Sequence, residues 1–270
     1  MTKNYTFIDL LNHLPKTNCK ECNVSTCMGF SVLVFKGEKK LKECPHLSED
    51  TISMLEEKID VGKTFENNLS KIVEQFKSQI LSMDLESSAE RLGGKYIDGK
   101  LTIKVLGKDF SVDSEGNITT DLHMHPWVLF PLLSYFLSCK GEPILENWMP
   151  FRELKGGKKW NPLFEQRCTK PMKKIADSHA DFFKDMIHIF NGKQVQSHYK
   201  ADVSLVLYPL PRVPILISYW KPEEGLESEL NIFFDSNVED NLNIEAIYAL
   251  CSGLVMMFEK IALRHSVNIN

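Results

Sequence analysis

Four cysteines near the N-terminus have the spacing of a metal-binding site. The pattern is C-x2-C-x4-C-x16-C, formed by Cys19, Cys22, Cys27 and Cys44, with Pro45 after the last cysteine. Four thiolates this close in sequence can ligate the irons of a 4Fe-4S cluster, and Cys-Pro at the closing ligand is common in iron–sulfur loops. A tetrahedral zinc site is the main alternative, but zinc sites usually pair two C-x-x-C knuckles and this chain has one. Disulfides or simply buried cysteines are the remaining alternatives.

The cysteine spacing also predicts a helix. Ser25 and Thr26 are N-cap residue types, and the apolar run from Met28 to Lys36 is closed by Gly37, which together indicate a short helix. Cys27 would then lie in the first turn, where the helix dipole favours a thiolate and an anionic cluster. Nearby lysines would form a solvated loop or receive an acidic electron-transfer partner: Lys36, Lys39, Lys40 and Lys42.

The residues around the cysteines resemble a known module. The matching segments are Leu14-Pro15-Lys16-Thr17-Asn18-Cys19, Glu21-Cys22, Thr26-Cys27 and Glu43-Cys44-Pro45. They resemble the 4Fe-4S module of the corrinoid/iron–sulfur protein large subunit, also found in electron-transport subunits of ion-pumping ferredoxin oxidoreductases. The resemblance covers about residues 5–50 and implies a low-potential cluster that passes single electrons. Lys20 and Asn23 depart from the module, which usually has glycine there; asparagine tolerates a positive φ better than lysine does.

Whole-chain properties restrict the function. At 270 residues, 43% hydrophobic and 25% charged, the chain has room for two domains and the composition of a soluble globular protein. Its net charge of −4 argues against nucleic acid or an anionic membrane as partner. The sequence shows neither a secretion signal nor an apolar stretch of about eighteen residues, so we expect no membrane span. We therefore expect a cytoplasmic protein, and the module implies an anaerobic host.

The elements expected along the chain give an α+β fold. We predict a helical cluster module at 1–60, a connector helix at 61–94 and a mixed α/β domain with a mainly antiparallel sheet at 95–270. Within the last domain, period-two alternation predicts a hairpin from Leu101 to Val112. Further strands are expected at 203–207, 213–220 and 230–234, with helices at 126–139, 171–191 and 243–264.

The C-terminal region also resembles a family. Its motifs are Leu101-Thr102-Ile103, Phe151-Arg152-Glu153-Leu154-Lys155-Gly156-Gly157, Ala201-Asp202-Val203, Pro211-Arg212-Val213-Pro214, Trp220 and Phe234-Asp235. They resemble an uncharacterised domain family of anaerobic bacteria and archaea, whose members often carry a four-cysteine module in front. The resemblance covers roughly residues 65–262 and implies an architecture but no activity. Many relatives have an acidic run after the tryptophan, where this chain has Lys221-Pro222-Glu223-Glu224-Gly225.

A basic stretch in this domain is a candidate anion site. Residues 152–174 hold eight basic and two acidic side chains. Arg152, Gly156, Gly157 and Lys158 could bind a phosphate- or carboxylate-bearing cofactor or an acidic partner, because glycine amides can approach an anion that lysines neutralise. The alternative is a glycine turn with ordinary surface lysines. Residues 221–245 hold eight acidic and one basic side chain, which are expected either to keep the protein soluble or to pair with the basic stretch.

Two histidines are the other candidate ligands in this domain. His123 and His125 would point to one side of an extended segment, with Asp121 nearby, and could bind a metal or serve as axial ligand to a corrinoid cobalt or haem iron. Pro126 follows directly, so the pair could instead lead into the next helix. Cys139, Cys168 and Cys251 are expected to be buried, although Cys168 lies in the basic stretch and could have a lowered pKa.

Two functions are consistent with these patterns. The first is a one-electron carrier whose C-terminal domain docks a redox partner of the corrinoid-protein, ferredoxin or flavodoxin type, with reductive activation of a corrinoid as one use. The second is a binding or accessory protein for a corrinoid, another tetrapyrrole or a metal cofactor, with a structural or redox-sensing cluster. The sequence favours a carrier over a stand-alone enzyme. It leaves the oligomeric state open.

Overall fold

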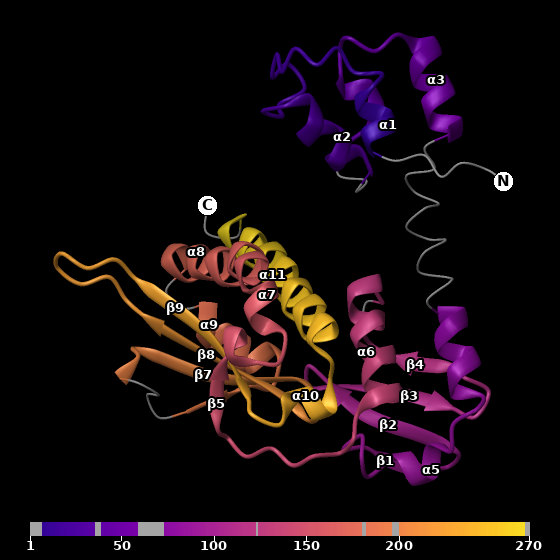
Figure 1. Ribbon diagram of the computed structural model, residues 1–270, viewed down its shortest axis with the longest axis vertical. Helices are drawn as coiled ribbons and strands as arrows, with labels where there is room; N and C mark the ends of the chain where they lie inside the picture. The colour runs from indigo at the N-terminus through magenta and orange to yellow at the C-terminus, as the bar shows by residue number, and fades with distance from the viewer. Residues whose placement is uncertain are drawn as a thin grey trace. The chain divides into compact units, whose positions relative to one another are not determined.

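The chain divides into two compact units in the computed structural model (Figure 1). The structure describes residues 7–35, 39–58, 73–122, 124–179, 182–195 and 200–267. The first unit is Met1–Lys71 and the second is Ile72–Asn270. The described residues contain helices and two wholly antiparallel sheets, which confirms the predicted α+β class.

The first unit is helical and has its own small core. Its elements are α1 (Phe7–Leu11), α2 (Cys27–Phe35), the 3-10 turn η1 (Leu41–Glu43) and α3 (Glu49–Lys58). The helix predicted after Cys27 is confirmed as α2. Leu10, Leu14, Phe30, Val34 and Leu55 are all buried, together with three of the cysteines. The apolar run of α2 therefore serves as the wall of the cysteine pocket and as the centre of this core.

The second unit begins with a helix over residues 73–80 and a four-stranded sheet. The strands are β1 (Lys95–Ile97), β2 (Lys100–Val105), β3 (Lys108–Asp113) and β4 (Ile118–Thr120), paired in chain order. Helix α6 (Pro126–Ser138) covers the sheet, as predicted for the apolar segment after Pro126 (Figure 1). Phe76, Phe110 and Phe136 meet edge to face with ring centroids 5.2–6.1 Å apart, which ties the helix, β3 and α6 together.

The rest of the second unit is built on a five-stranded sheet. Its order is β5-β9-β8-β7-β6, with β5 (Trp148–Pro150), β6 (Lys193–Gln194), β7 (Val203–Leu210), β8 (Val213–Trp220) and β9 (Glu229–Asp235). The strands predicted at 203–207, 213–220 and 230–234 are confirmed as the three central strands. They read as continuous apolar runs because both faces carry buried side chains. Helices lie on one face, and on the other Val206, Leu216 and Phe233 from β7, β8 and β9 form a small cluster of their own (Figure 1).

The helices of this unit differ from the sequence prediction in three places. Sequence reasoning missed α7 (Gly157–Phe164) and the π-helical turn after it (Glu165–Thr169), which continue into α8 (Lys170–Ser178) at the start of the predicted helix. The single helix predicted at 171–191 was wrong, because α8 ends at Ser178 and α9 (Phe182–Ile189) is separate. Turns and the short α5 (Leu85–Ser88) follow residue 80, so the connector helix does not continue to Gly93. The first part of that prediction, residues 61–72, lies outside the described residues.

The C-terminal helix joins the two sheet layers of the second unit. After the short α10 (Val238–Asn241), α11 (Ile244–Val267) packs against both α6 and α8. Gly253 permits close contact with α6, since a Cβ there would lie 1.9 Å from Trp127 Cε3. Residues Ile244–Leu263 are long and apolar enough to cross a membrane, with mean hydropathy 1.6, so the expectation of no such stretch was wrong. Half of that window is buried inside the unit, and core helices share this composition.

Candidate metal centre

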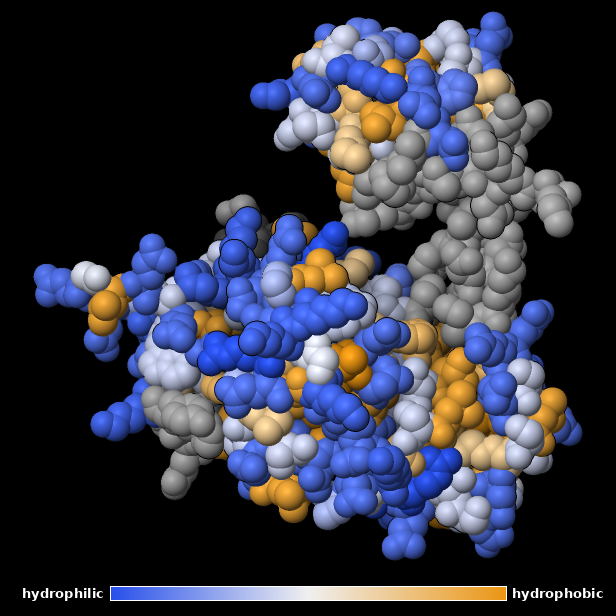
Figure 2. Space-filling model, viewed as in Figure 1, coloured by the Kyte–Doolittle hydropathy of each residue, from blue (hydrophilic) through white to orange (hydrophobic). Residues whose placement is uncertain are grey.

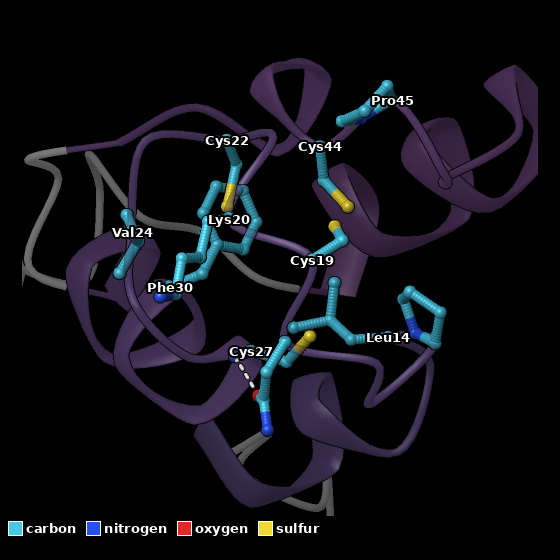
Figure 3. Close-up of a pocket in the computed structure, with 11 residues that line it drawn as sticks. Leu14, Cys19, Lys20, Cys22, Val24, Cys27, Phe30, Cys44 and Pro45 are labelled. Atoms are coloured by element: carbon cyan, nitrogen blue, oxygen red, sulfur yellow. Dashed lines mark hydrogen bonds between the residues drawn. The ribbon is translucent and has the colours of Figure 1, made fainter.

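The four cysteines of the spacing pattern line one pocket in the first unit. Cys19 and Cys22 come from the loop before α2, Cys27 is the first residue of α2, and Cys44 directly follows η1. Figure 3 shows their side chains around a common space. Most of the remaining wall is apolar, and Asn18 and Lys20 also line it; the apolar residues are Leu14, Pro15, Val24, Phe30 and Pro45. Sulfur donors enclosed by apolar groups suit a metal cofactor that must be kept from water.

Burial and mutual repulsion make the charged form of these thiols costly without a bound cation. Cys22, Cys27 and Cys44 are buried, whereas Cys19 is exposed. Burial raises the pKa of Cys44, a hydrogen bond from the His46 amide opposes this, and charge on Cys22, Cys27 and Cys19 raises it further. Four thiolates repelling one another in a pocket are stabilised by a bound cation, so the donor set fits a metal centre. Zinc and a 4Fe-4S cluster both take four thiolates, and the side chains alone do not separate them.

The loop that carries Cys19 and Cys22 is built from left-handed residues. Lys16, Asn18, Lys20 and Asn23 all have positive φ, between 52° and 66°. Lys20 (66°) and Asn23 (58°) are the two positions where the resembling module usually has glycine. Each left-handed residue turns the chain sharply, and the loop thereby presents both cysteines to the same pocket. Lysine has no side-chain means of easing this conformation, so Lys20 is strained.

Two side chains cap the N-terminus of α2. Asn18 Oδ1 accepts a hydrogen bond from the Cys27 amide at 2.8 Å, drawn as the dashed line in Figure 3. Thr26 Oγ1 accepts from the Gly29 amide at 2.9 Å, as its N-cap residue type predicted. Asn18 reaches across nine residues and was not predicted as a cap. Its bond fixes the loop before Cys19 against the first turn of α2.

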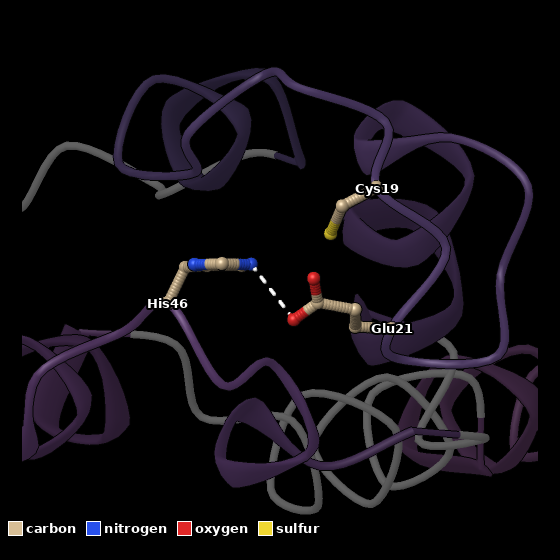
Figure 4. A group of neighbouring side chains, drawn as sticks. All are labelled: Cys19, Glu21 and His46. Carbon is tan, nitrogen blue, oxygen red and sulfur yellow. Dashed lines mark ion pairs between the residues drawn. The ribbon is translucent and has the colours of Figure 1, made fainter.

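The segment after Cys44 contacts the C-x-x-C knuckle. His46 Nε2 lies 3.1 Å from Glu21 Oε2, and Cys19 Sγ lies beside this pair (Figure 4). Before Cys44, Glu43 accepts from the Lys40 amide and from Lys39 Nζ, so the pKa of its carboxyl is lowered. Lys39 is therefore already paired with Glu43. Sequence reasoning singled out neither Glu21 nor His46 as a functional residue, because a Glu and a His so far apart in sequence carry no spacing signal.

The predicted anion site does not form one hollow. Arg152 lines a hollow of about 160 Å³ together with Asn161, Glu165, Lys170 and Asn231, whereas Gly156, Gly157 and Lys158 do not line it. Gly157 is required by packing, since a Cβ there would lie 1.9 Å from the Phe151 carbonyl oxygen. Its amide donates to the Leu154 carbonyl, and the Lys155 amide donates to Glu239 Oε2. These contacts favour the alternative of a structural glycine turn.

The basic and acidic stretches are not paired through their side chains. Across the described ranges, no ion pair joins the basic residues of 152–174 to the acidic residues of 221–245. Lys173 pairs with Asp177, and Asp240 pairs with Lys140. Figure 2 shows a mostly hydrophilic surface on the projecting hairpin between β8 and β9, which carries Glu223, Glu224 and Glu227. Both stretches thus leave charged groups at the surface.

Of the two candidate histidines, His125 lies within the described residues. His123 lies outside the described residues. His125 is the N-cap residue of α6, and its Nε2 lies 3.0 Å from Trp127 Nε1, while its Nδ1 faces the Trp127 amide at 3.5 Å. Both ring nitrogens therefore face Trp127, and ligation of a metal by His125 would require breaking this contact.

The remaining cysteines are buried, as predicted. Cys139, Cys168 and Cys251 are each at most 3% exposed. The lowered pKa considered for Cys168 was wrong: burial raises it to about 12, against a hydrogen bond with Ser252. Burial likewise raises the pKa of Cys139 and Cys251. These thiols are packing groups in the core of the second unit.

Two motifs of the C-terminal resemblance have structural roles. Arg212 donates to the carbonyl oxygens of Arg91 and Glu90, which holds the β7–β8 turn to the chain before β1. Asp235, 1% exposed, accepts from the amides of Leu145 and Glu146. A buried carboxylate with several amide donors orders the long connection before β5. The motifs therefore preserve the fold.

A comparison with protein-family models identifies the larger part of the chain. Residues 84–257 match the model described as "Domain of unknown function (DUF3786)". The chain belongs to the DUF3786 family. In front of the DUF3786 region, residues 14–46 match the model described as "Putative Fe-S cluster", which includes all four cysteines. These matches confirm both resemblances and favour an iron–sulfur cluster over zinc. No solved structure matches the chain.

Curated relatives of this DUF3786 protein are similar to its N-terminus. The acetyl-CoA decarbonylase/synthase complex subunit gamma of Methanothermobacter thermautotrophicus is 43% identical over 51 residues, 19% of this chain and 11% of that protein. The same subunit of Methanocaldococcus jannaschii is 32% identical over 74 residues, 27% of this chain and 12% of that protein. The corrinoid/iron-sulfur protein large subunit of Moorella thermoacetica is 36% identical over 44 residues, which are 16% of this chain and 10% of that protein. The chain thus spans about a tenth of the length of these relatives.

Proposed function

We propose that this protein is a cytoplasmic one-electron carrier of anaerobic metabolism that holds a single 4Fe-4S cluster on Cys19, Cys22, Cys27 and Cys44. The observation that carries the proposal is the convergence of these four thiols, from three segments of the first unit, on one apolar pocket. A cluster of this kind accepts and donates single electrons. The printed names of the relatives support a role in one-carbon chemistry with corrinoid proteins.

The side chains of the pocket support this use in distinct ways. Leu14, Val24 and Phe30 keep water from the buried side of the cysteines, which strengthens interactions between the thiolates and nearby amides. The α2 N-terminus favours negative charge at Cys27. Cys19 is exposed, so the proposed partner approaches from this side, where the path for an electron is shortest.

The second unit would then receive the partner or its cofactor. We propose a corrinoid protein, or a carrier of the ferredoxin or flavodoxin type, as the partner. The hollow at Arg152 and Lys170 could take a carboxylate or phosphate of such a cofactor. Reductive activation of a corrinoid is the finer form of the proposal.

One observation favours a second candidate function, in which the DUF3786 region is a cofactor-binding or accessory domain. A hollow of about 410 Å³ lies beside β4, lined by Val73, Lys77, Asn117, Ile118, Thr120, Leu122 and Met124. Its size is typical of small-ligand sites. Residues 123 and 125, the candidate axial histidines, follow directly on this lining in the sequence.

Rapid-mixing kinetics with the full chain separate the two functions. A carrier, reduced anaerobically, should be oxidised quickly by a cobalt(II) corrinoid protein, and a variant with all four cysteines changed to Ser should show no reaction. An accessory protein should instead bind a corrinoid tightly, and binding should persist in the four-Ser variant. Absence of electron transfer from a loaded cluster to corrinoid, ferredoxin and flavodoxin alike would refute the carrier proposal.

A further inference from the structure

Cys19 differs from the other three cysteines in its surroundings. It is exposed, whereas Cys22, Cys27 and Cys44 are at most 9% exposed and enclosed by the core of the first unit. An exposed ligand is the one that solvent can displace most easily. The structure places two other possible metal ligands beside Cys19.

Those donors are Glu21 and His46, which form a group with Cys19. The Sγ atom of Cys19, a carboxylate oxygen of Glu21 and a ring nitrogen of His46 all lie within 4.8 Å of one another. His46 Nε2 contacts Glu21 Oε2 at 3.1 Å, and Figure 4 shows the other carboxylate oxygen pointing toward the Cys19 sulfur. In the part of the chain that the structure describes, no second group of three such side chains is this close.

The chemistry of a carboxylate suits this arrangement. Its two oxygens can act separately, so Glu21 can accept a hydrogen bond from His46 with Oε2 and keep Oε1 for a metal. Iron accepts carboxylate as well as thiolate ligands. His46 belongs to the segment after Cys44, and its contact with Glu21 holds that carboxylate near the Cys19 sulfur. Glu21 is thus a donor, and His46 is a positioning residue.

We propose that Glu21 is a replacement ligand for the iron at the Cys19 corner, held in position by His46. In the exchange, the bond between iron and the Cys19 sulfur would break, the released thiolate would take a proton from a water molecule and leave hydroxide in the solvent, and a bond would form between that iron and Glu21 Oε1. No electron is transferred. The exchange would let the iron at Cys19 tolerate the loss of its thiolate. This inference rests on the proposed cluster site.

The test compares cysteine variants of the full chain after anaerobic reconstitution with iron and sulfide. Iron and sulfide per protein, the visible absorption and the electron paramagnetic resonance spectrum are measured. We expect Cys19→Ala to keep a four-iron cluster with an altered resonance spectrum, whereas Cys44→Ala loses the cluster. In Cys19→Ala/Glu21→Gln, both proposed ligands of that iron are removed, so the fourth iron should be lost.

Two further comparisons exclude general effects. Cys19→Ala/Glu49→Gln removes an exposed carboxylate of the same unit and should behave like Cys19→Ala. Cys19→Ala/His46→Ala should lower the affinity for the fourth iron by about 10–100-fold. Cys19→Ala/His46→Gln should restore it, because the contact is made by His46 Nε2 and a Gln amide nitrogen reaches about as far and can still donate to Glu21. The inference is overturned if Cys19→Ala loses its cluster as completely as Cys44→Ala, or if adding Glu21→Gln changes nothing. A wild-type chain that takes up no cluster would instead refute the proposed function.

Discussion

Asn18 Oδ1 accepts a hydrogen bond from the backbone amide of Cys27, the first residue of α2, at 2.8 Å. The bond joins the residue before one cysteine of the site to another cysteine of the site. It also satisfies an amide that the start of a helix leaves without an intrahelical partner. One side chain thereby sets the distance between the knuckle and the helix that carry three of the four thiols.

Removing this bond should loosen the centre. Asn18→Gly keeps the positive φ of 52° but loses the hydrogen bond to the Cys27 amide, and we expect it to destabilise the loaded first unit by about 1 kcal/mol. Asn18→Asp keeps a hydrogen-bond acceptor, so its stability should remain within a few tenths of a kcal/mol of wild type. Urea unfolding of the reconstituted chain, followed at the visible absorption of the cluster, measures both. Equal midpoints for the two variants would show that the bond contributes nothing.

Lys20 offers a test of backbone strain. Its φ of 66° is costly for lysine and free for glycine, so Lys20→Gly should raise the stability of the first unit by about 0.5 kcal/mol after the added chain entropy. Lys42 is an exposed residue of η1 without a positive φ, and Lys42→Gly should lower stability by about 0.5–1 kcal/mol. In the same unfolding assay, the two substitutions should change the free energy of unfolding in opposite directions. A decrease for both variants would mean that Lys20 is not strained.

Much of this structure was predictable from patterns of residues that are close together in the sequence. The cysteine spacing, the N-cap at Thr26 and the apolar run of α2 are neighbours in sequence, so their positions followed from residue types. Continuous apolar segments likewise predicted the central strands β7, β8 and β9. The positive φ at Lys20 was foreseen only through the module that this chain resembles.

Contacts between distant residues were not predictable. The pairing of Glu21 with His46 depends on how the chain returns after Cys44, and the cap from Asn18 skips nine residues. Gly156 and Gly157 looked like an anion loop because sequence shows glycine but not the Phe151 carbonyl that requires it. The break between α8 and α9 was missed because amphipathic spacing continues on both sides of it.

Gly253 tests the packing between α6 and α11. An alanine methyl group would overlap the six-membered ring of Trp127, so Gly253→Ala should cost about 3 kcal/mol. Trp127→Phe shortens that side chain, and the double variant should recover part of the loss. All four tryptophans lie in the second unit, so fluorescence during urea unfolding reports on it. Additive effects of the two substitutions would contradict the contact.

Tyr219 predicts a pH dependence of stability. Burial raises its pKa from 10 to about 12, and the hydrogen bond from its hydroxyl to Asp177 at 2.8 Å acts in the same direction. A raised pKa gives stability that is complete below pH 10 and is lost as pH rises through about 12. The advantage of wild type over Tyr219→Phe, on the order of 1 kcal/mol at neutral pH, should therefore shrink across this window. Tyr208→Phe, at a residue of β7 only partly buried, is the control; a constant advantage would refute the prediction.

The central claim is that the four thiols hold one 4Fe-4S cluster that passes single electrons. The most direct measurement is anaerobic purification of the full chain, with iron, sulfide and zinc analysis and resonance spectra of the oxidised and reduced protein. We expect a brown protein with about four irons and four sulfides per chain, with no resonance signal when oxidised and a paramagnetic signal after reversible one-electron reduction. A colourless protein that contains one zinc and no sulfide would contradict it.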